Sequence, residues 1–257
     1  MSAIQYQLLY DADCPLCVWY TGYFKQHGYL QPAEVVPMQQ ANLQNLPGLH
    51  RQKMTNEIPL VNIAQQSVRY GTDAIIAIIG KKHPTLAKIA SWRAFQPFIK
   101  TLYSFISYNR KVITGTLPSC SHMTCAPAFH LRNRMAFVVL MQLLISAVFI
   151  PGIVTGFGLP FTLHEGWWMM GVSAILSIAF FLHEKQQQLW MELCGQMTMW
   201  FLLTSVGAWL LANVQHYLQM PWFTAVAGTF YFLQFLWPQS KQRWQYVQLQ
   251  YSLYKNA

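Results

Sequence analysis

Two cysteines near the amino terminus are spaced so that they could form a redox pair. Cys14 and Cys17 follow two aspartates in the stretch LLYDADCPLC, residues 8–17. The apolar residues before Asp11 predict a strand, and the apolar and aromatic side chains around and after Cys17 recur at helical spacing. In a first helical turn, residues i and i+3 stand close enough for a disulfide, and the free amides and the helix dipole stabilise a thiolate.

This placement predicts different roles for the two thiols. Cys14, at the open end of the helix, is the expected nucleophile, and Cys17 is the expected resolving thiol. Asp11 and Asp13 bring negative charge close to Cys14 and oppose the thiolate, while Asp13 is also a candidate N-cap of the helix. We therefore interpret Cys14 and Cys17 as catalytic and the two aspartates as supporting residues.

The elements that must position these thiols belong to a mixed α/β domain. The pattern predicts strands over residues 4–10 and 34–38, followed by a hairpin of strands 59–63 and 67–71. It predicts helices over 15–27, from 73 to 79 and onward, over 86–95 and over 98–113, with Pro97 breaking the last two apart.

A Cys-x-x-Cys at the start of a helix that follows a strand is the redox arrangement of the thioredoxin fold. Pro59, in the stretch EIPLV, stands directly before a predicted strand and after a loop. Thioredoxin folds carry a cis-proline beside the active disulfide at such a point, although a proline at the start of a strand is common in any fold. We expect an α/β thioredoxin-like domain with Pro59 as a supporting residue.

Three stretches, YDADCPLC, VRYGTDAIIAI and YSFISYNRKVI, resemble in order and spacing the bacterial DCC family of thiol-disulfide oxidoreductases, named after its Asp-x-x-Cys-x-x-Cys pattern. The resemblance covers about residues 5–115. It implies a thioredoxin-like domain, dithiol chemistry, and protein or small-molecule thiols and disulfides as substrates. The residues that match the family pattern are Asp11, Cys14, Cys17, Gly71, Asp73, Ala74, Asn109 and Arg110.

The second half of the chain predicts an all-α four-helix transmembrane domain. Four apolar stretches, 135–158, 166–182, 193–213 and 220–237, contain no Asp, Glu, Lys or Arg, and tryptophans lie near their ends. We therefore divide the chain into a thioredoxin-like domain (1–115), a cysteine-containing juxtamembrane linker (116–134), the transmembrane domain (135–238) and a cytoplasmic tail (239–257).

The basic residues predict orientation and partners. Of the 17 Lys and Arg, 13 lie at or before Arg134, together with five of the eight acidic residues. The positive-inside rule places both termini of a multi-pass protein of the inner (plasma) membrane in the cytoplasm. Because the charges are scattered and no nucleic-acid motif accompanies them, we expect contact with membrane lipid and no nucleic-acid binding. The sequence predicts no oligomeric state.

The stretch CSHMTC supplies a second pair of thiols, Cys120 and Cys125. We favour a second redox pair that exchanges with the first, a relay between the soluble domain and the membrane. The alternatives are an incidental pair and a metal site built from both pairs of cysteines. On the metal alternative the chain is a non-enzymatic membrane protein whose cysteine-bearing domain binds a metal or a partner.

We assign no metal ligands and no resident cofactor, and keep two further alternatives open. Glu192 and Cys194 lie near the cytoplasmic start of the third predicted helix, with Gln196 one turn beyond Glu192 and Gln142 in the first helix. The ionisable residue either reaches the lipid headgroups, or these side chains form a polar site for a quinone or another small electron carrier. The Asp-x-Asp after the first strand also resembles haloacid-dehalogenase-type phosphatases. That reading lacks the adjacent acidic pair needed to hold magnesium, because the other carboxylates of this half stand apart.

Overall fold

The computed structural model describes residues 6–42, 46, 48–115, 129–158 and 187–255. The chain divides into two compact units, Met1–Ala128 and Phe129–Ala257, called here unit 1 and unit 2. Each is described separately.

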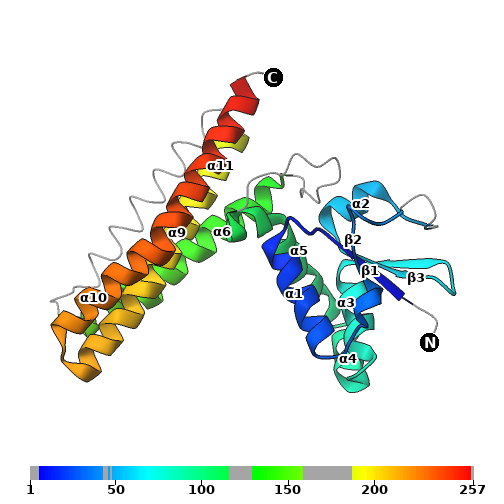
Figure 1. Ribbon diagram of the computed structural model, residues 1–257, viewed down its shortest axis with the longest axis horizontal. Helices are drawn as coiled ribbons and strands as arrows, with labels where there is room; N and C mark the ends of the chain where they lie inside the picture. Colours follow the sequence, from blue (N-terminus) through cyan, green and yellow to red (C-terminus); the bar gives the residue numbers. More distant parts are fainter. Residues whose placement is uncertain (1–5, 43–45, 47, 116–128, 159–186, 256–257) are drawn as a thin grey trace. The chain divides into compact units, whose positions relative to one another are not determined.

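Unit 1 is built on a four-stranded mixed sheet in the order β2-β1-β3-β4 (Figure 1). The central strand β1 (Tyr6–Tyr10) pairs in parallel with β2 (Val35–Pro37) and antiparallel with β3 (Pro59–Asn62), and β4 (Ser67–Tyr70) completes a hairpin with β3. The strand and hairpin predictions are confirmed, with ends that differ by one or two residues.

The predicted helices of unit 1 are present, and two short ones were missed. The helices are α1 (Pro15–Gln26), α3 (Gly71–Gly80), α4 (Pro84–Ala90) and α5 (Gln96–Thr114), and the missed ones are η1 (Pro32–Glu34) and α2 (Arg51–Asn56). Helix α4 ends five residues before the predicted end at residue 95. Pro97 lies in the first turn of α5, where its missing N–H costs nothing, so it opens a helix instead of breaking one.

The sheet of unit 1 has an apolar core on each face, because successive residues of a strand point to opposite sides. Leu8 and Leu60 pack with Phe24 of α1 and Ile78 of α3 on one face. On the other face, the core residues are Leu9, Met38, Met54 and Val61, with Met54 contributed by α2. A β-α-β unit followed by a hairpin and a helix, with this strand order, fits a thioredoxin-like domain.

The peptide bond before Pro59 is not cis, since none of the described residues has a cis peptide bond. Pro59 is fully buried and opens β3. The pairing of Leu8 with Leu60 places Pro59 beside the end of β1, at the edge of the sheet from which the cysteine loop leaves.

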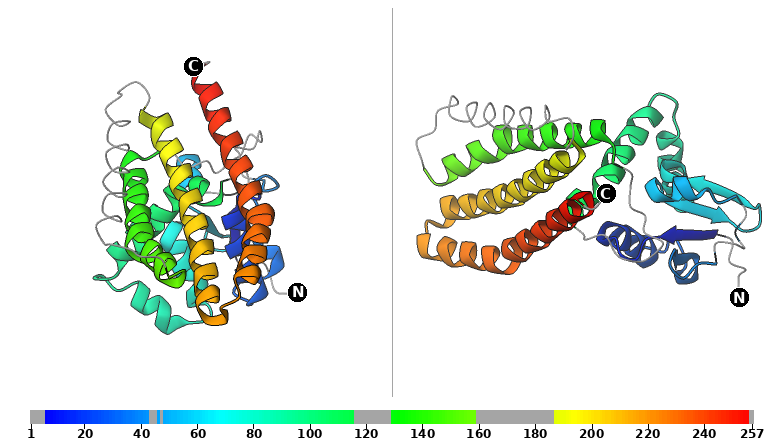
Figure 2. Two further views of the ribbon diagram at one scale, coloured as in Figure 1. Left: turned by 90° about the vertical axis from the view of Figure 1, so that its left-hand side faces the viewer. Right: turned by 90° about the horizontal axis from the view of Figure 1, so that it is seen from above.

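Unit 2 contains three long helical segments in its described part (Figure 2). The first runs through α6 (Leu131–Leu144), η3 (Ile145–Phe149) and α7 (Ile150–Gly156), and the second is α9 (Gln187–Leu218). The third comprises α10 (Pro221–Tyr231), η5 (Phe232–Leu236) and α11 (Trp237–Lys255). The helix predicted over 166–182 lies outside the described residues, and part of the predicted tail lies within α11.

Two of these segments, Leu131–Gly156 and Gln187–Leu218, are long and apolar enough to cross a membrane. The third is not among the described helices that meet this criterion, since Gln, Tyr and Trp side chains interrupt its apolar stretch. The first and third segments each contain one π-helical turn that ends two residues before a proline. These turns are η3, before Pro151, and η5, before Pro238. A proline cannot make the regular i−4 bond, so the wider turn lets the helix continue through it.

Small residues bring the helices of unit 2 into close contact. A Cβ added at Gly156 would lie 2.7 Å from the Cβ of Ala212 in α9, and one added at Gly207 would collide with the Tyr231 ring. The Tyr231 hydroxyl donates a hydrogen bond to the Leu203 carbonyl at 2.8 Å. Such packing of glycine against a neighbouring helix is typical of membrane helices.

Candidate redox site

The two thiols of unit 1 lie at the start of α1, directly beyond the end of β1. Cys14 and Cys17 are free thiols, exposed to 7% and 3%. Cys14 is the N-cap residue of α1, with extended φ and ψ of −97° and 108°, and its sulfur accepts a hydrogen bond from the Cys17 amide at 3.4 Å. Pro15 occupies the first helical turn, where its fixed φ suits the helix.

This position lowers the pKa of the Cys14 thiol from 9.0 to about 7. The largest cause is a hydrogen bond from the Cys17 side chain, and the Cys17 backbone N–H and the positive charge of Arg110 act in the same direction. Burial and the negative charge of Asp11 act against them. Near neutral pH, Cys14 therefore populates both the thiol and the thiolate.

Cys17 is affected in the opposite sense. Its hydrogen bond to Cys14, its burial and the negative charge of the Cys14 thiolate raise the pKa of the Cys17 thiol far above the ordinary value. Two cysteines three residues apart thus differ sharply in acidity, as expected for an attacking and a resolving thiol.

The expectation that Asp13 caps the helix is wrong, because Cys14 occupies the N-cap position. Asp13 is exposed, and its amide donates a hydrogen bond to Asp11 Oδ1 at 3.1 Å. Asp11 is buried, with 6% of its surface exposed, and it also accepts a hydrogen bond from Gln39 Nε2 at 2.9 Å. Gln39 Oε1 accepts a hydrogen bond from the Ala12 amide at 3.4 Å, so this side chain supports the loop that carries Cys14.

Gln39 could not be predicted from the sequence as a neighbour of the thiols. It follows β2, and β2 pairs in parallel with β1, so the carboxyl ends of both strands meet at one edge of the sheet. The Met38 amide continues this pairing with a hydrogen bond to the Tyr10 carbonyl at 2.8 Å. No residue pattern around position 39 indicates this role.

Arg110 of α5 is the second residue of the site that sequence reasoning did not place there. Its side chain is only 9% exposed, and its Nη2 donates a hydrogen bond to the Thr55 carbonyl at 2.7 Å. Its positive charge contributes to the lowered pKa of Cys14 and partly opposes the rise in the pKa of Cys17. The one signal in the sequence was the match of Asn109 and Arg110 to the terminal element of the family pattern.

The loop before Pro59 is held by α5 and by a glycine. Tyr103 Oη accepts the Ile58 amide at 3.1 Å, and burial raises the pKa of Tyr103 to about 12, so this hydroxyl stays protonated. Gly71 has φ +56°, and a Cβ there would lie 3.1 Å from both Tyr103 and Glu57. The glycine is therefore required by both its backbone conformation and the space around it.

The described residues contain no group of three or more His, Cys, Asp or Glu side chains that could hold a metal ion. Cys120 and Cys125 lie outside the described residues, so the relay and the metal site that would use them stay predictions. Cys194 lies in α9 of unit 2 as a free, half-buried thiol.

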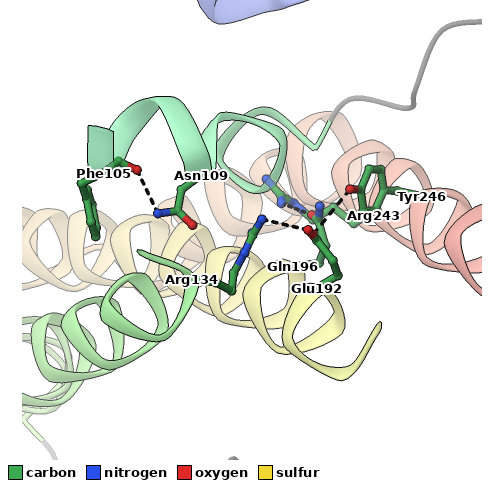
Figure 3. Close-up of polar contacts among 7 residues, drawn as sticks. All are labelled: Phe105, Asn109, Arg134, Glu192, Gln196, Arg243 and Tyr246. Atoms are coloured by element: carbon green, nitrogen blue, oxygen red, sulfur yellow. Dashed lines mark hydrogen bonds and ion pairs between the residues drawn. The ribbon is translucent and has the colours of Figure 1, made fainter. Parts of the chain in front are cut away.

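Unit 2 has a buried polar cluster where α6, α9 and α11 meet, and we call it the arginine cluster (Figure 3). Arg134 Nη2 pairs with Glu192 Oε1 at 3.0 Å, and the Tyr246 hydroxyl donates to Glu192 Oε2 at 3.4 Å. Arg243 Nη1 donates to Gln196 Oε1 at 2.5 Å. Each of these five residues is less than 10% exposed.

The arginine cluster contradicts the alternative in which Glu192 reaches the lipid headgroups. Glu192 points inward because Arg134 and Tyr246 satisfy its charge, which offsets the cost of burying it. Gln196 is likewise engaged by Arg243. The quinone site suggested for Glu192 and Gln196 stays a prediction.

Residues 8–116 match the family model described as DCC1-like thiol-disulfide oxidoreductase. The match runs from the middle of β1 to just beyond the end of α5 and includes both thiols, Gln39 and Arg110. It confirms the resemblance found in the sequence. Comparisons with curated proteins and with solved structures gave no match.

Proposed function

We propose that this chain exchanges a dithiol for a disulfide through Cys14 and Cys17, because residues 8–116 match the family model described as DCC1-like thiol-disulfide oxidoreductase. The observation that carries the proposal is the asymmetry of the two thiols. With a pKa of about 7, Cys14 is partly thiolate near neutral pH, whereas the raised pKa of Cys17 keeps that thiol protonated. The attacking species in thiol-disulfide exchange is the thiolate.

The reaction proceeds in two steps. The Cys14 thiolate attacks one sulfur of a partner disulfide, forms a mixed disulfide and releases the other partner sulfur as a thiolate. Cys17 then loses its proton and attacks the Cys14 sulfur, which forms the Cys14–Cys17 disulfide and releases the second partner thiolate. Two electrons pass from the chain to the partner, and the reverse sequence oxidises a partner dithiol.

The second part of the proposal is that unit 2 anchors this chemistry in a membrane. Support comes from the two helices that are long and apolar enough to span a bilayer and from the glycine-mediated contacts between helices. The distribution of Lys and Arg favours both termini in the cytoplasm. A reporter fused after Ala257 should then be cytoplasmic, and the chain should resist extraction from membranes by alkaline carbonate.

A trapping experiment tests the catalytic roles. In the full-length chain with Cys120→Ser, Cys125→Ser and Cys194→Ser, the further change Cys17→Ser should let mixed disulfides with Cys14 accumulate, because the resolving thiol is missing. Cys14→Ser should trap nothing, and the trapped species should disappear on addition of a strong reductant. Equal trapping by both variants, or none by Cys17→Ser, would reject the assigned roles.

A further inference from the structure

Helices α4 and α5 of unit 1, together with the turn between them, carry a run of exposed apolar side chains. Trp92, Phe98 and Ile89 are 65%, 60% and 58% exposed, values that are unusual for large apolar residues on one short segment. We call the exposed set the α4–α5 stripe, and it consists of Leu86, Ile89, Trp92, Phe95, Phe98 and Leu102.

The way α4 packs explains why its apolar side chains face outward. No residue of α4 is buried, and its close contact with α3 is made by small residues, since a Cβ added at Gly80 would lie 3.1 Å from the Ala87 Cβ. In α5, Phe98 and Leu102 are four residues apart and therefore lie on one side of the helix. These side chains therefore do not contribute to the core of unit 1.

Positive charge accompanies the stripe. Lys88, Arg93 and Lys100 are exposed on the same segment, and from residue 74 to residue 164 the sequence contains no Asp or Glu. A segment that exposes Trp, Phe and Leu together with Lys and Arg has the composition of an element that lies in the headgroup layer of an anionic membrane. Aromatic side chains favour that layer, and lysines extend their charged ends to the phosphates.

We propose that the α4–α5 stripe docks unit 1 onto an anionic lipid surface, with its apolar side chains at the acyl boundary and the positive charge of Lys88, Arg93 and Lys100 attracted to the lipid phosphates. The proposal rests on the membrane anchoring proposed above, because a tether to a bilayer raises the local concentration of lipid at unit 1. The single docking surface would hold the thiol domain in a fixed orientation on the membrane.

The test uses the full-length chain reconstituted in nanodiscs. The background carries Cys120→Ser, Cys125→Ser and Cys194→Ser, and Cys14 and Cys17 are oxidised to a disulfide so that neither is labelled. A polarity-sensitive fluorophore is attached at Ile89→Cys. The control carries the same fluorophore at Ser67→Cys on β4. In anionic lipid the Ile89 probe should shift to the blue and be quenched by brominated acyl chains, whereas the Ser67 probe should do neither. Zwitterionic lipid should give little quenching at either position.

Two charge variants separate specific docking from a general effect of charge. Neutralising Lys88, Arg93 and Lys100 to Gln should lower the ratio of docked to free unit 1 about 100-fold. The matched variant Lys25→Gln, Lys53→Gln, Arg69→Gln removes the same charge from exposed positions elsewhere in unit 1 and should leave the quenching unchanged. Equal loss in both variants would overturn the proposal.

A measurement on the unaltered chain guards against misfolding of the labelled variants. Amides of α4 and of the first half of α5 should exchange hydrogen more slowly in anionic than in zwitterionic nanodiscs. A blue-shifted Ile89 probe without quenching by brominated lipid would mean that protein covers the stripe, a second copy or another segment, and would overturn the proposal. Flotation of the whole chain with vesicles tests the anchoring separately.

Discussion

Replacement of Cys17 by alanine should raise the pKa of Cys14, because the largest cause of its low value is the hydrogen bond from the Cys17 side chain. Alanine removes this donor and keeps the backbone amide that also binds the Cys14 sulfur at 3.4 Å. Serine at the same position keeps a donor, so Cys17→Ser is the matched control. Both variants are made with Cys120→Ser, Cys125→Ser and Cys194→Ser, so that Cys14 is the one remaining thiol.

The size of the effect follows from the pKa values. A thiol with a pKa of about 7 is about half thiolate at pH 7, whereas one at the ordinary value of 9.0 is about 1% thiolate. If Cys17→Ala raises the pKa of Cys14 by about one unit, the thiolate fraction at pH 7 falls about fivefold. Cys17→Ser should stay within about half a unit of the parent.

The assay is the rate of alkylation by iodoacetamide as a function of pH, followed by mass spectrometry. The midpoint of the profile reports the pKa of Cys14, independently of how intrinsic reactivity changes with that pKa. An unchanged midpoint in Cys17→Ala would refute the reasoning, since the acidity would then come from the helix start and Arg110 alone. A midpoint near 9 in the Cys17→Ser control would refute the low pKa itself.

Further predictions concern the redox couple, the arginine of the site and the arginine cluster. The reduction potential of the Cys14–Cys17 couple should fall by about 59 mV per pH unit below pH 7, where reduction binds two protons, and by about 30 mV per pH unit above it, where reduction binds one. A single slope through neutral pH would argue against an acidic Cys14. Arg110→Met should move the alkylation midpoint of Cys14 upward, since a positive charge that lowers this pKa is lost. Cys14→Ala should lower the pKa of Cys17, as read from its alkylation profile, because its main partner is removed. Glu192→Gln should lower the free energy of unfolding by about 3 kcal/mol, measured by denaturation in detergent, and the double variant Arg134→Met, Glu192→Leu should regain most of it.

The parts of the fold that depend on local pattern could be predicted from the sequence. Alternation and apolar runs located β1 and the β3–β4 hairpin, and helical spacing after Cys17 located α1. The α2 helix was missed because its six residues, RQKMTN, carry one apolar side chain and hence no period. Pro97 was misread because a proline inside a run of helical pattern looks the same whether it ends one helix or starts the next.

The residues around the thiols were harder to predict, because tertiary pairing assembles them. Gln39 reaches the cysteine loop through the parallel pairing of β1 and β2, and Arg110 reaches it through the packing of α5, almost 100 residues from Cys14 along the chain. Asp13 was a sound candidate for the N-cap by residue type, yet the cap is the residue after it. A cysteine as N-cap has no strong statistical preference, so only the backbone geometry reveals it.

The raised pKa of Cys17 suits a resolving thiol only if it changes during the reaction. In the reduced site, its causes are the hydrogen bond to Cys14, burial and the negative charge of the Cys14 thiolate. Formation of a mixed disulfide consumes that thiolate, which removes its charge and its capacity as a strong acceptor. Burial and the positive charge of Arg110 remain, so the proton of Cys17 becomes easier to lose at the step that needs its thiolate. The same pair of contacts would thus keep Cys17 inactive before a partner arrives and release it once Cys14 has reacted.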